Sequence, residues 1–253
     1  MRIANTNQDF DLDTPAHPNI DFYARQAAGA AIESARAAIG GKRAFSLMRP
    51  PGHHAMRDRA MGFCYFNNIA VAALDALAVA DVPNTSPRPT TPKGFANASA
   101  ATGKIERVAI WDFDAHHGNG TEALVAHNEK IMFASIHQYP GWPGTGTKSF
   151  ANILNFPVAP YSPRSNHVAA AEQALEKLLE FKPQLLLVSA GFDAYKNDPI
   201  TQMTLERDDF ATFGKWLADV KIPTAAILEG GYSDNLPELI DVFLSSWDSE
   251  STS

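Results

Sequence analysis

Residues 112 to 120 read Asp-Phe-Asp-Ala-His-His-Gly-Asn-Gly, directly after the apolar run Arg107-Val108-Ala109-Ile110-Trp111. The run predicts a buried β-strand, and the polar stretch begins where that strand ends. Residues two apart in an extended segment point to the same side, so Asp114 and His116 can offer an oxygen and a nitrogen to one cation. A solvated cluster of charges is the alternative interpretation, and the rest of the chain argues against it. The stretch therefore predicts a metal site at the end of a strand.

Three further polar clusters each follow an apolar run of strand type. The runs and their clusters are 45–48 with 49–54, 185–189 with 190–193, and 224–228 with 229–232. In open parallel α/β sheets the ligand site lies beyond the carboxyl ends of the strands. We therefore expect all four clusters to converge on one crevice.

The chain as a whole alternates between strand patterns and helix patterns. The expected strands are 45–48, 107–112, 131–136, 152–156, 184–189 and 223–228, and the expected helices are 21–39, 67–80, 118–128, 164–181, 206–219 and 236–246. Alternation of this kind, with strands that are almost continuously apolar, indicates a parallel sheet covered on both faces. The sequence predicts an α/β fold of three layers, α/β/α, with a mainly parallel sheet.

Length and composition favour a single domain over residues 1–253. The chain has 253 residues, of which 45% are hydrophobic, and this is enough for one well-buried core but too little for two domains of ordinary size. Residues 82–103 are rich in Pro, Thr, Ser, Ala and Gly and have almost no periodic apolar signal. We expect this segment to be a flexible surface insertion.

Charge and cysteine content narrow the class of protein. A net charge of −7 argues against direct nucleic-acid binding, which needs clustered Lys and Arg. Cys64 is the single cysteine, so no internal disulfide forms, and a reducing compartment is favoured. The sequence shows neither a signal peptide nor an apolar stretch near the roughly 18 residues that a membrane span needs. We expect a cytoplasmic protein, or a nuclear one if the source is eukaryotic, with no membrane partner.

The metal site needs a third ligand, since a catalytic zinc takes about three protein ligands and keeps an open position for water. Asp193 is the best candidate beside Asp114 and His116, because it stands at another strand end behind small residues. Two carboxylates and one imidazole favour zinc, while iron(II) is compatible with the same set.

Two adjacent histidines follow the rigid turn at residues 49–52. A lone histidine is more often structural, but a pair at a glycine turn that faces a metal favours catalysis. One of His53 and His54 can take a proton from metal-activated water and return it to a leaving amine. Asp112 can orient and charge-stabilise His53, and Asn119 can hold His54 with a neutral partner.

Tyr232 follows two glycines at a strand end. Buried aromatic packing is one interpretation of this residue. The glycines, however, allow the phenol to lean into a site, where it can donate a hydrogen bond to a developing oxyanion.

Taken together, these motifs resemble the zinc-dependent histone deacetylases of the arginase/deacetylase superfamily, nearest to the class II and bacterial deacetylase-like branch. The similar segments are 49–54, 62–68, 112–120, 135–137, 143–146, 190–194 and 228–232, in the family's order over roughly Asp13 to Tyr232. The resemblance implies the arginase/deacetylase α/β fold and hydrolysis of the amide of an acylated amine.

The resemblance also implies a role for each matching residue. It places zinc at Asp114, His116 and Asp193, proton transfer at His53 and His54, and the oxyanion donor at Tyr232. It implies a substrate tunnel formed by Gly62, Phe63, Trp142, Ile200 and, at its rim, Asp13. It further implies a structural potassium ion held by Asp112, the main chain of Asp114 and His116, Ser135 and the Ile136 carbonyl.

Compared with the family, the sequence departs at its N-terminus, where the family's first two strands are absent ahead of Asp13. The segment after Tyr232 is also short, and the insertion at 82–103 is atypical. We therefore expect residues 43–47 to form an exposed edge of the sheet. Such an edge invites pairing, so we expect either self-association into a homo-oligomer or coverage by residues 1–12.

Several functions are compatible with this set of residues. The first is deacylation of acyl-lysine, and the second is hydrolysis of acetylated polyamines or other small amides. Polyamine-selective relatives often carry an acidic gate, whereas the residue after Asp198-Pro199 is the apolar Ile200, which favours a neutral acyl chain. A truncated, non-catalytic scaffold is disfavoured because the catalytic set is intact. Arginase-type chemistry is disfavoured because Asn119 and Ala194 stand where a second metal would want carboxylates.

Overall fold

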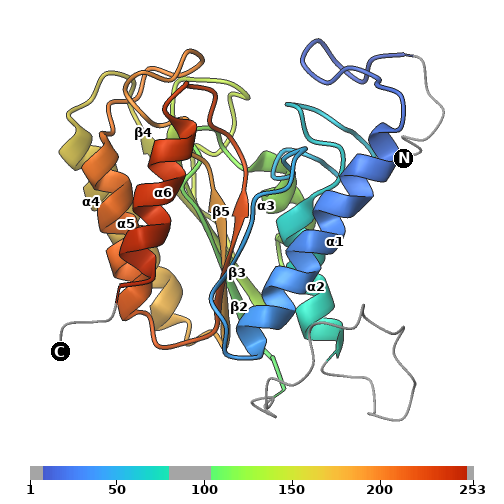
Figure 1. Ribbon diagram of the computed structural model, residues 1–253, viewed down its shortest axis with the longest axis vertical. Helices are drawn as coiled ribbons and strands as arrows, with labels where there is room; N and C mark the ends of the chain where they lie inside the picture. Colours follow the sequence, from blue (N-terminus) through green and yellow to red (C-terminus); the bar gives the residue numbers. More distant parts are fainter. Residues whose placement is uncertain (1–7, 80–103, 250–253) are drawn as a thin grey trace.

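The computed structural model describes residues 8–79 and 104–249 of the chain. Its strands are β1 (Ala44–Ser46), β2 (Val108–Asp112), β3 (Ile131–Gln138), β4 (Ile153–Val158), β5 (Leu185–Ala190) and β6 (Thr224–Leu228). Its helices are α1 (Ile20–Ile39), α2 (Asn68–Val79), α3 (Asn119–Val125), α4 (Arg164–Glu180), α5 (Arg207–Asp219) and α6 (Leu236–Trp247). Apart from the consecutive strands β3 and β4, which were also predicted, strands and helices alternate along the chain (Figure 1).

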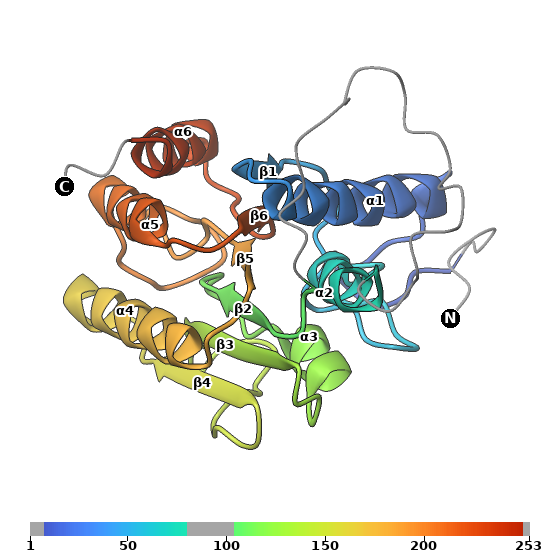
Figure 2. The ribbon, with the colours of Figure 1, turned by 90° about the horizontal axis from the view of Figure 1, so that it is seen from below.

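The six strands form one sheet in the order β1-β6-β5-β2-β3-β4, and every neighbouring pair is parallel. Helices α1, α2 and α3 cover one face, and α4, α5 and α6 cover the other (Figure 2). Each face has its own buried hydrophobic cluster. The predicted three-layer α/β/α fold is confirmed, and within the described residues the sheet is entirely rather than mainly parallel.

The central strands explain this architecture. Every residue of β2 and of β5 is buried, and the two strands pair in register from Val108 opposite Leu185 to Asp112 opposite Ser189. A strand that is apolar on both faces can be stable only where helices shield both faces from water. The continuous apolar runs in the sequence therefore select the layered parallel arrangement.

Element bounds lie within two residues of the prediction except at the end of α3, and the differences at the ends of α3 and β3 have local causes. Helix α3 ends at Val125 rather than at 128, because Ala126 takes extended backbone angles. Strand β3 continues to Gln138 rather than 136, because β4 pairs with it as far as Val158. Pro157 is tolerated within β4 because that strand lies at the edge of the sheet.

Strand β1 forms the opposite edge of the described sheet, as expected, and pairs with β6. Phe45 of this strand packs against Phe243 of α6, with ring centroids 5.9 Å apart. Phe10 does not cover β1 but packs against Tyr65 at a centroid distance of 5.6 Å. Coverage of β1 by residues 1–7 and the expected insertion at 82–103 concern residues outside the described ranges, and self-association stays a prediction.

Within those ranges, no helix combines the length and the apolar character that crossing a membrane requires.

The topology brings the four polar clusters to one edge of the sheet. Strands β1, β6, β5 and β2 are consecutive in the sheet and parallel, so their carboxyl ends lie side by side. Each of these four ends carries one of the polar clusters. The expected convergence therefore follows directly from strand order.

Candidate active site and metal centre

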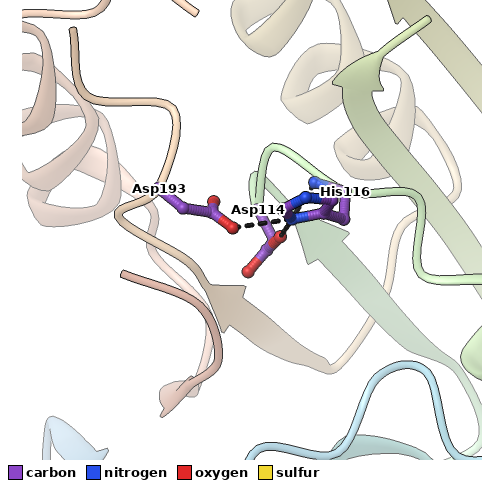
Figure 3. Close-up of side chains that lie close together, drawn as sticks. All are labelled: Asp114, His116 and Asp193. Atoms are coloured by element: carbon purple, nitrogen blue, oxygen red, sulfur yellow. Dashed lines mark hydrogen bonds and ion pairs between the residues drawn. The ribbon is translucent and has the colours of Figure 1, made fainter. Parts of the chain in front are cut away.

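Three side chains from two strand ends form a candidate metal centre. Asp114 and His116 lie in the loop after β2, and Asp193 lies in the loop after β5 (Figure 3). His116 Nδ1 is 2.8 Å from Asp193 Oδ2 and 3.3 Å from Asp114 Oδ1. One donor atom from each residue lies within 4.8 Å of the others, so the three can share one cation.

Close backbone contacts fix the two carboxylates. The Gly230 N–H donates to Asp114 Oδ2 at 2.7 Å, and the Ala115 N–H donates to Asp193 Oδ1 at 2.8 Å. A Cβ atom at Gly191 or Gly230 would collide with the Asp114 carboxylate, so only glycine allows these backbones to approach. The oxygen and nitrogen donors that remain fit a divalent cation of the zinc or iron(II) type.

The electrostatics of this cluster also suit a cation. Burial, together with the nearby Asp114 charge, raises the pKa of Asp193 to about 6. Burial opposes ionisation of Asp114 too, but His53 and His116 hold the pKa of that carboxyl well below its usual range. Burial lowers the pKa of His116, but the carboxylates of Asp193 and Asp114 outweigh burial and raise this pKa to about 10. Binding of a cation must therefore displace a proton from His116.

His53 and His54 stand side by side next to the candidate metal centre, and their hydrogen-bond partners differ in charge. His53 Nδ1 is 3.0 Å from Asp112 Oδ2, whereas His54 Nδ1 is 2.8 Å from Asn119 Oδ1. Both rings are buried, and their centroids are 3.9 Å apart. The expected pairing of each histidine with its own partner is present in the geometry.

The surroundings of the two imidazoles shift their pKa values in opposite directions. Burial lowers the pKa of His53, but the Asp114 and Asp112 carboxylates outweigh it and raise the pKa well above its usual value. For His54, burial lowers the pKa, and the neighbouring charge of His53 lowers it further. The arrangement thus favours a cationic His53 beside a neutral His54 that can accept a proton.

These groups open into a cavity of about 270 Å³. Its lining is Asp13, Pro51, His53, His54, Gly62, Phe63, Asp114, His116, Trp142, Ile200, Gly230 and Tyr232. All five residues expected to form a substrate tunnel are in this lining, although Asp13 and Ile200 are far apart in the sequence. Asp193 lies behind the lining, where it faces His116.

Tyr232 enters the cavity from the loop after β6. Its backbone N–H donates to Asp198 Oδ2 at 2.8 Å, and Arg49 donates to the Gly231 carbonyl at 3.0 Å. Burial raises the pKa of the Tyr232 phenol well above its usual value, and the charges of Asp193 and Asp114 add to this effect. The phenol therefore keeps its proton and can act as a hydrogen-bond donor.

The aromatic wall formed by Phe63 depends on a tight turn. Gly62 and Phe63 have φ values of 58° and 63°, and the backbones of Met61 and Cys64 bond reciprocally across the turn. Positive φ at both central positions defines a type I′ turn, and it directs Phe63 toward Tyr232 at a centroid distance of 5.7 Å.

Trp142 forms a second aromatic wall of the cavity. Its ring stands edge-on to His54 at a centroid distance of 4.6 Å. Phe63 and Trp142 are 38% and 42% exposed, which is consistent with a position at the mouth of the cavity.

The residues expected to hold a structural potassium ion lie together on β2, β3 and the loop after β2. Asp112 pairs with Ser135 across the two strands, and its Oδ1 accepts the Asp114 N–H at 3.2 Å. The Ser135 hydroxyl is 3.0 Å from His137 Nδ1. A potassium ion at this place stays a prediction.

Sequence reasoning gave no role to two buried carboxyl groups beside the cavity. Glu229 accepts backbone N–H groups from the loop that carries His53, and Asp198 accepts those of Tyr232 and Ile200. Both residues occur within or beside motifs noted in the sequence, but a single acidic residue there gives no sign of which loop it will contact. Pro51 and Gly230 also line the cavity, although the sequence motifs had given them a role only in the turn before His53 and in the placement of Tyr232.

Comparison with known proteins finds relatives of similar sequence and solved structures of similar fold. A 40% identical protein of Synechocystis sp., described as uncharacterized, aligns over 235 residues, which are 90% of this chain and 69% of that protein. A probable deacetylase of Methanothermobacter thermautotrophicus is 35% identical over 232 residues, which are 88% of this chain and 63% of the relative. The crystal structure of an acetylpolyamine aminohydrolase from Burkholderia pseudomallei superposes with a TM-score of 0.80 at 29% identity, covering 94% of this chain and 66% of that one.

These shares mean that the chain spans about two thirds of the length of these relatives. The family model described as "Histone deacetylase domain" matches residues 2–83 and 95–246, which is most of the chain. The match confirms the resemblance drawn from the sequence motifs. The chain belongs to the histone deacetylase domain family.

Proposed function

We propose that the protein is a metal-dependent amide hydrolase that removes an acetyl or longer acyl group from an amine, with acyl-lysine as its substrate. The observation that carries this proposal is the convergence of His53, His54 and Tyr232 with the Asp114–His116–Asp193 cluster on one cavity. Amide hydrolysis needs a polarised carbonyl, a group that moves a proton, and a donor to the oxyanion. The cavity offers one group for each of these tasks.

Asp114, His116 and Asp193 would hold the divalent cation, with zinc favoured and iron(II) as the alternative. When bound, the cation supplies Lewis acidity toward the amide carbonyl and the attacking water. A potassium ion near Asp112 and Ser135 would support the loop that carries these ligands.

The protein's own groups account for the proton movements. His54, neutral and buried, takes a proton from the attacking water as its oxygen bonds to the carbonyl carbon. His54 then returns that proton to the amine nitrogen as the C–N bond breaks, which leaves a carboxylic acid and a free amine, and the acid passes its remaining proton to solvent. His53, paired with Asp112, stays cationic and stabilises negative charge, while the Tyr232 O–H donates to the oxyanion.

The form of the cavity favours a substrate with an extended apolar stem. Phe63, Trp142 and Ile200 supply apolar surface at its mouth, which suits the methylene groups of a lysine side chain. The Asp13 carboxylate at the same mouth can accept a hydrogen bond from the substrate backbone.

Hydrolysis of acetylated polyamines is a second candidate function. The same Asp13 carboxylate is also suited to an ammonium group, and a structurally similar protein is described as an acetylpolyamine aminohydrolase. Ile200 weighs against this candidate, since it provides no further negative charge.

A substrate panel tests the proposal. Zinc-loaded protein is assayed for amine release from acetyl-lysine peptides, longer acyl-lysine peptides and acetylpolyamines, with a hydroxamate as inhibitor and Tyr232→Phe as control. We expect the highest kcat/KM on an acyl-lysine peptide and inhibition by the hydroxamate. Preference for acetylpolyamines would select the second candidate, and no hydrolysis by folded, metal-loaded protein would overturn both.

We further propose a cytoplasmic location. The free, buried thiol of Cys64 supports it, because this thiol fits a reducing compartment.

A further inference from the structure

Glu229 is a fully buried carboxyl group that the reaction described above does not use. It follows β6 directly, and its Oε2 accepts the N–H of Gly52 at 2.7 Å and that of His53 at 3.1 Å. Its Oε1 accepts the Ser189 hydroxyl at 3.2 Å. One side chain at the end of β6 thus bonds to the backbone of the loop after β1.

Burial makes this carboxyl group costly. It raises the pKa of Glu229 to about 7, which shows how strongly the interior disfavours the charged form. An apolar residue would avoid this cost, but it could not accept the two loop N–H groups. The contact is therefore expected to serve the loop rather than the core.

The loop that carries His53 and His54 is held on several sides. The His53 N–H bonds to Glu229, while the His53 carbonyl accepts the Thr121 N–H at 3.0 Å. At the preceding turn, a Cβ atom on Gly52 would lie 2.7 Å from the Phe66 carbonyl oxygen, so that turn is already close-packed. Glu229 supplies the acceptor that fixes the His53 backbone from the side of β6.

We propose that Glu229 is a positioning residue that holds His53 and His54 in their working geometry by accepting the backbone N–H groups of Gly52 and His53. The inference rests on the proposed function, because it assigns those histidines to proton transfer. Glu229 does not itself line the cavity, and among the described residues its side chain forms no hydrogen bond with a side chain of the proton-transfer pair or with Asp114, His116 or Asp193. Its effect is transmitted through the backbone.

Two substitutions separate the hydrogen bonds from the charge. Glu229→Gln keeps an oxygen for both N–H groups and turns its amide toward Ser189, whose hydroxyl can accept. Glu229→Ala removes the acceptor. We expect Glu229→Ala to lower kcat about 10²-fold with KM and metal content little changed, because misplacing catalytic groups by about 1 Å has this effect. Glu229→Gln should recover kcat to within about tenfold of wild type.

A readout other than activity accompanies the kinetics. Amide hydrogen exchange of the peptide covering residues 49–55 should accelerate in metal-loaded Glu229→Ala and stay slow in Glu229→Gln. Asp209→Asn is the matched control, since Asp209 is also a buried carboxyl group that accepts a backbone N–H but serves the start of α5. It should lower thermal stability without changing kcat or exchange at 49–55.

The outcomes distinguish this inference from the proposed function. If wild type hydrolyses no amide of the panel, the proposed function fails, while exchange at residues 49–55 still tests the hydrogen bonds of Glu229. If wild type is active, a Gln variant as impaired as the Ala variant, or unchanged exchange in the Ala variant, would overturn the positioning role. If Glu229→Ala does not fold, Glu229→Gln and Glu229→Asp test the inference instead. The aspartate side chain is shorter, so Glu229→Asp should show faster amide exchange at residues 49–55 and a lower kcat than Glu229→Gln. Equal values in these two variants would overturn the inference.

Discussion

The rings of His53 and His54 lie 3.9 Å apart, yet the first is paired with a carboxylate and the second with an amide. Two adjacent histidines thus stand in different surroundings, which shift their pKa values in opposite directions. The pKa of His53 lies well above its usual value because the carboxylates of Asp114 and Asp112 outweigh burial, and that of His54 lies well below because burial and His53 act together.

This difference predicts unequal effects of two substitutions. His54→Ala should lower kcat by about 10²–10⁴-fold because it removes the group that moves the proton. Asp112→Asn should cost about 10–100-fold because it removes only the partner of His53. Steady-state kinetics on variants of equal metal content measure both effects. A larger loss for Asp112→Asn would reject this division of labour.

If Asp193 is a metal ligand, Asp193→Ala should lose the bound metal ion. Two remaining ligands are too few to hold a divalent ion, so elemental analysis should show close to zero metal per chain. Asp198→Asn is the matched control and should keep the metal, since the Asp198 oxygens accept the N–H groups of Tyr232 and Ile200 instead. Full metal retention in Asp193→Ala would contradict the ligand assignment.

We expect loss of the Tyr232 hydroxyl to affect turnover without affecting substrate or metal binding. Tyr232→Phe removes one donor to the oxyanion and leaves the ring in place against Phe63. The value of kcat should fall by about 10²–10³-fold, with little change in KM or in bound metal. Wild-type turnover in this variant would mean that another group polarises the carbonyl.

Gly62 lies between Trp142 of the cavity wall and His54, the residue proposed to transfer the proton. A Cβ atom there would collide with the Trp142 ring and lie 2.7 Å from His54 Cδ2. Gly62→Ala should therefore lower kcat/KM at least tenfold in addition to a strain cost of about 1–2 kcal/mol from its positive φ. Gly41→Ala is the control, because Gly41 also has a positive φ of 83° but has open space around a Cβ atom. Equal loss of activity in both variants would show that strain alone is responsible.

His167 of α4 predicts a pH dependence of stability that is separate from catalysis. Its side chain is fully buried, neither nitrogen has a hydrogen-bond partner among the described residues, and burial lowers its pKa from 6.5 to about 4. The His167 imidazole therefore binds a proton more readily in the unfolded chain than in the folded one. The free energy of unfolding is therefore highest above pH 6.5 and decreases as the pH falls from 6.5 toward 4. The loss is on the order of 3 kcal/mol.

Urea unfolding at pH 8 and pH 5 measures this effect. His167→Leu should lose less stability than wild type between these two pH values, because its side chain cannot be protonated. An equal loss in both proteins would show that His167 does not determine the acid sensitivity.

Local sequence patterns were sufficient to predict most of the fold. Strands such as β2 and β5 are continuous apolar runs, and helices such as α4 follow the period of an α-helix, so their positions were predicted to within about two residues. The ends of α3 and β3 were predicted less well. They depend on a backbone change at Ala126 and on the pairing of β3 with β4, and neither leaves a signal in the local sequence.

The sequence was sufficient to propose Asp114, His116 and Asp193 as metal ligands, because a metal-binding group needs particular side chains, which the chain displays at the ends of apolar runs. The structure brings these three side chains together as a candidate metal centre. The partners of His53 and His54 were also proposed from the sequence. The role that we infer for Glu229 was not, because hydrogen bonding to a loop 176 residues away requires knowledge of which strands are neighbours.

The sequence by itself determined the layered α/β architecture and the chemical types of the site residues, because side-chain periodicity and ligand chemistry are local properties. Only the tertiary structure decided that β1, β6, β5 and β2 are adjacent, that Glu229 contacts the loop that carries His53, and that the carboxylates of Asp114 and Asp112 outweigh burial at His53. The physical reason is that electrostatic and packing energies depend on distances between atoms, and the order of strands in the sheet sets those distances.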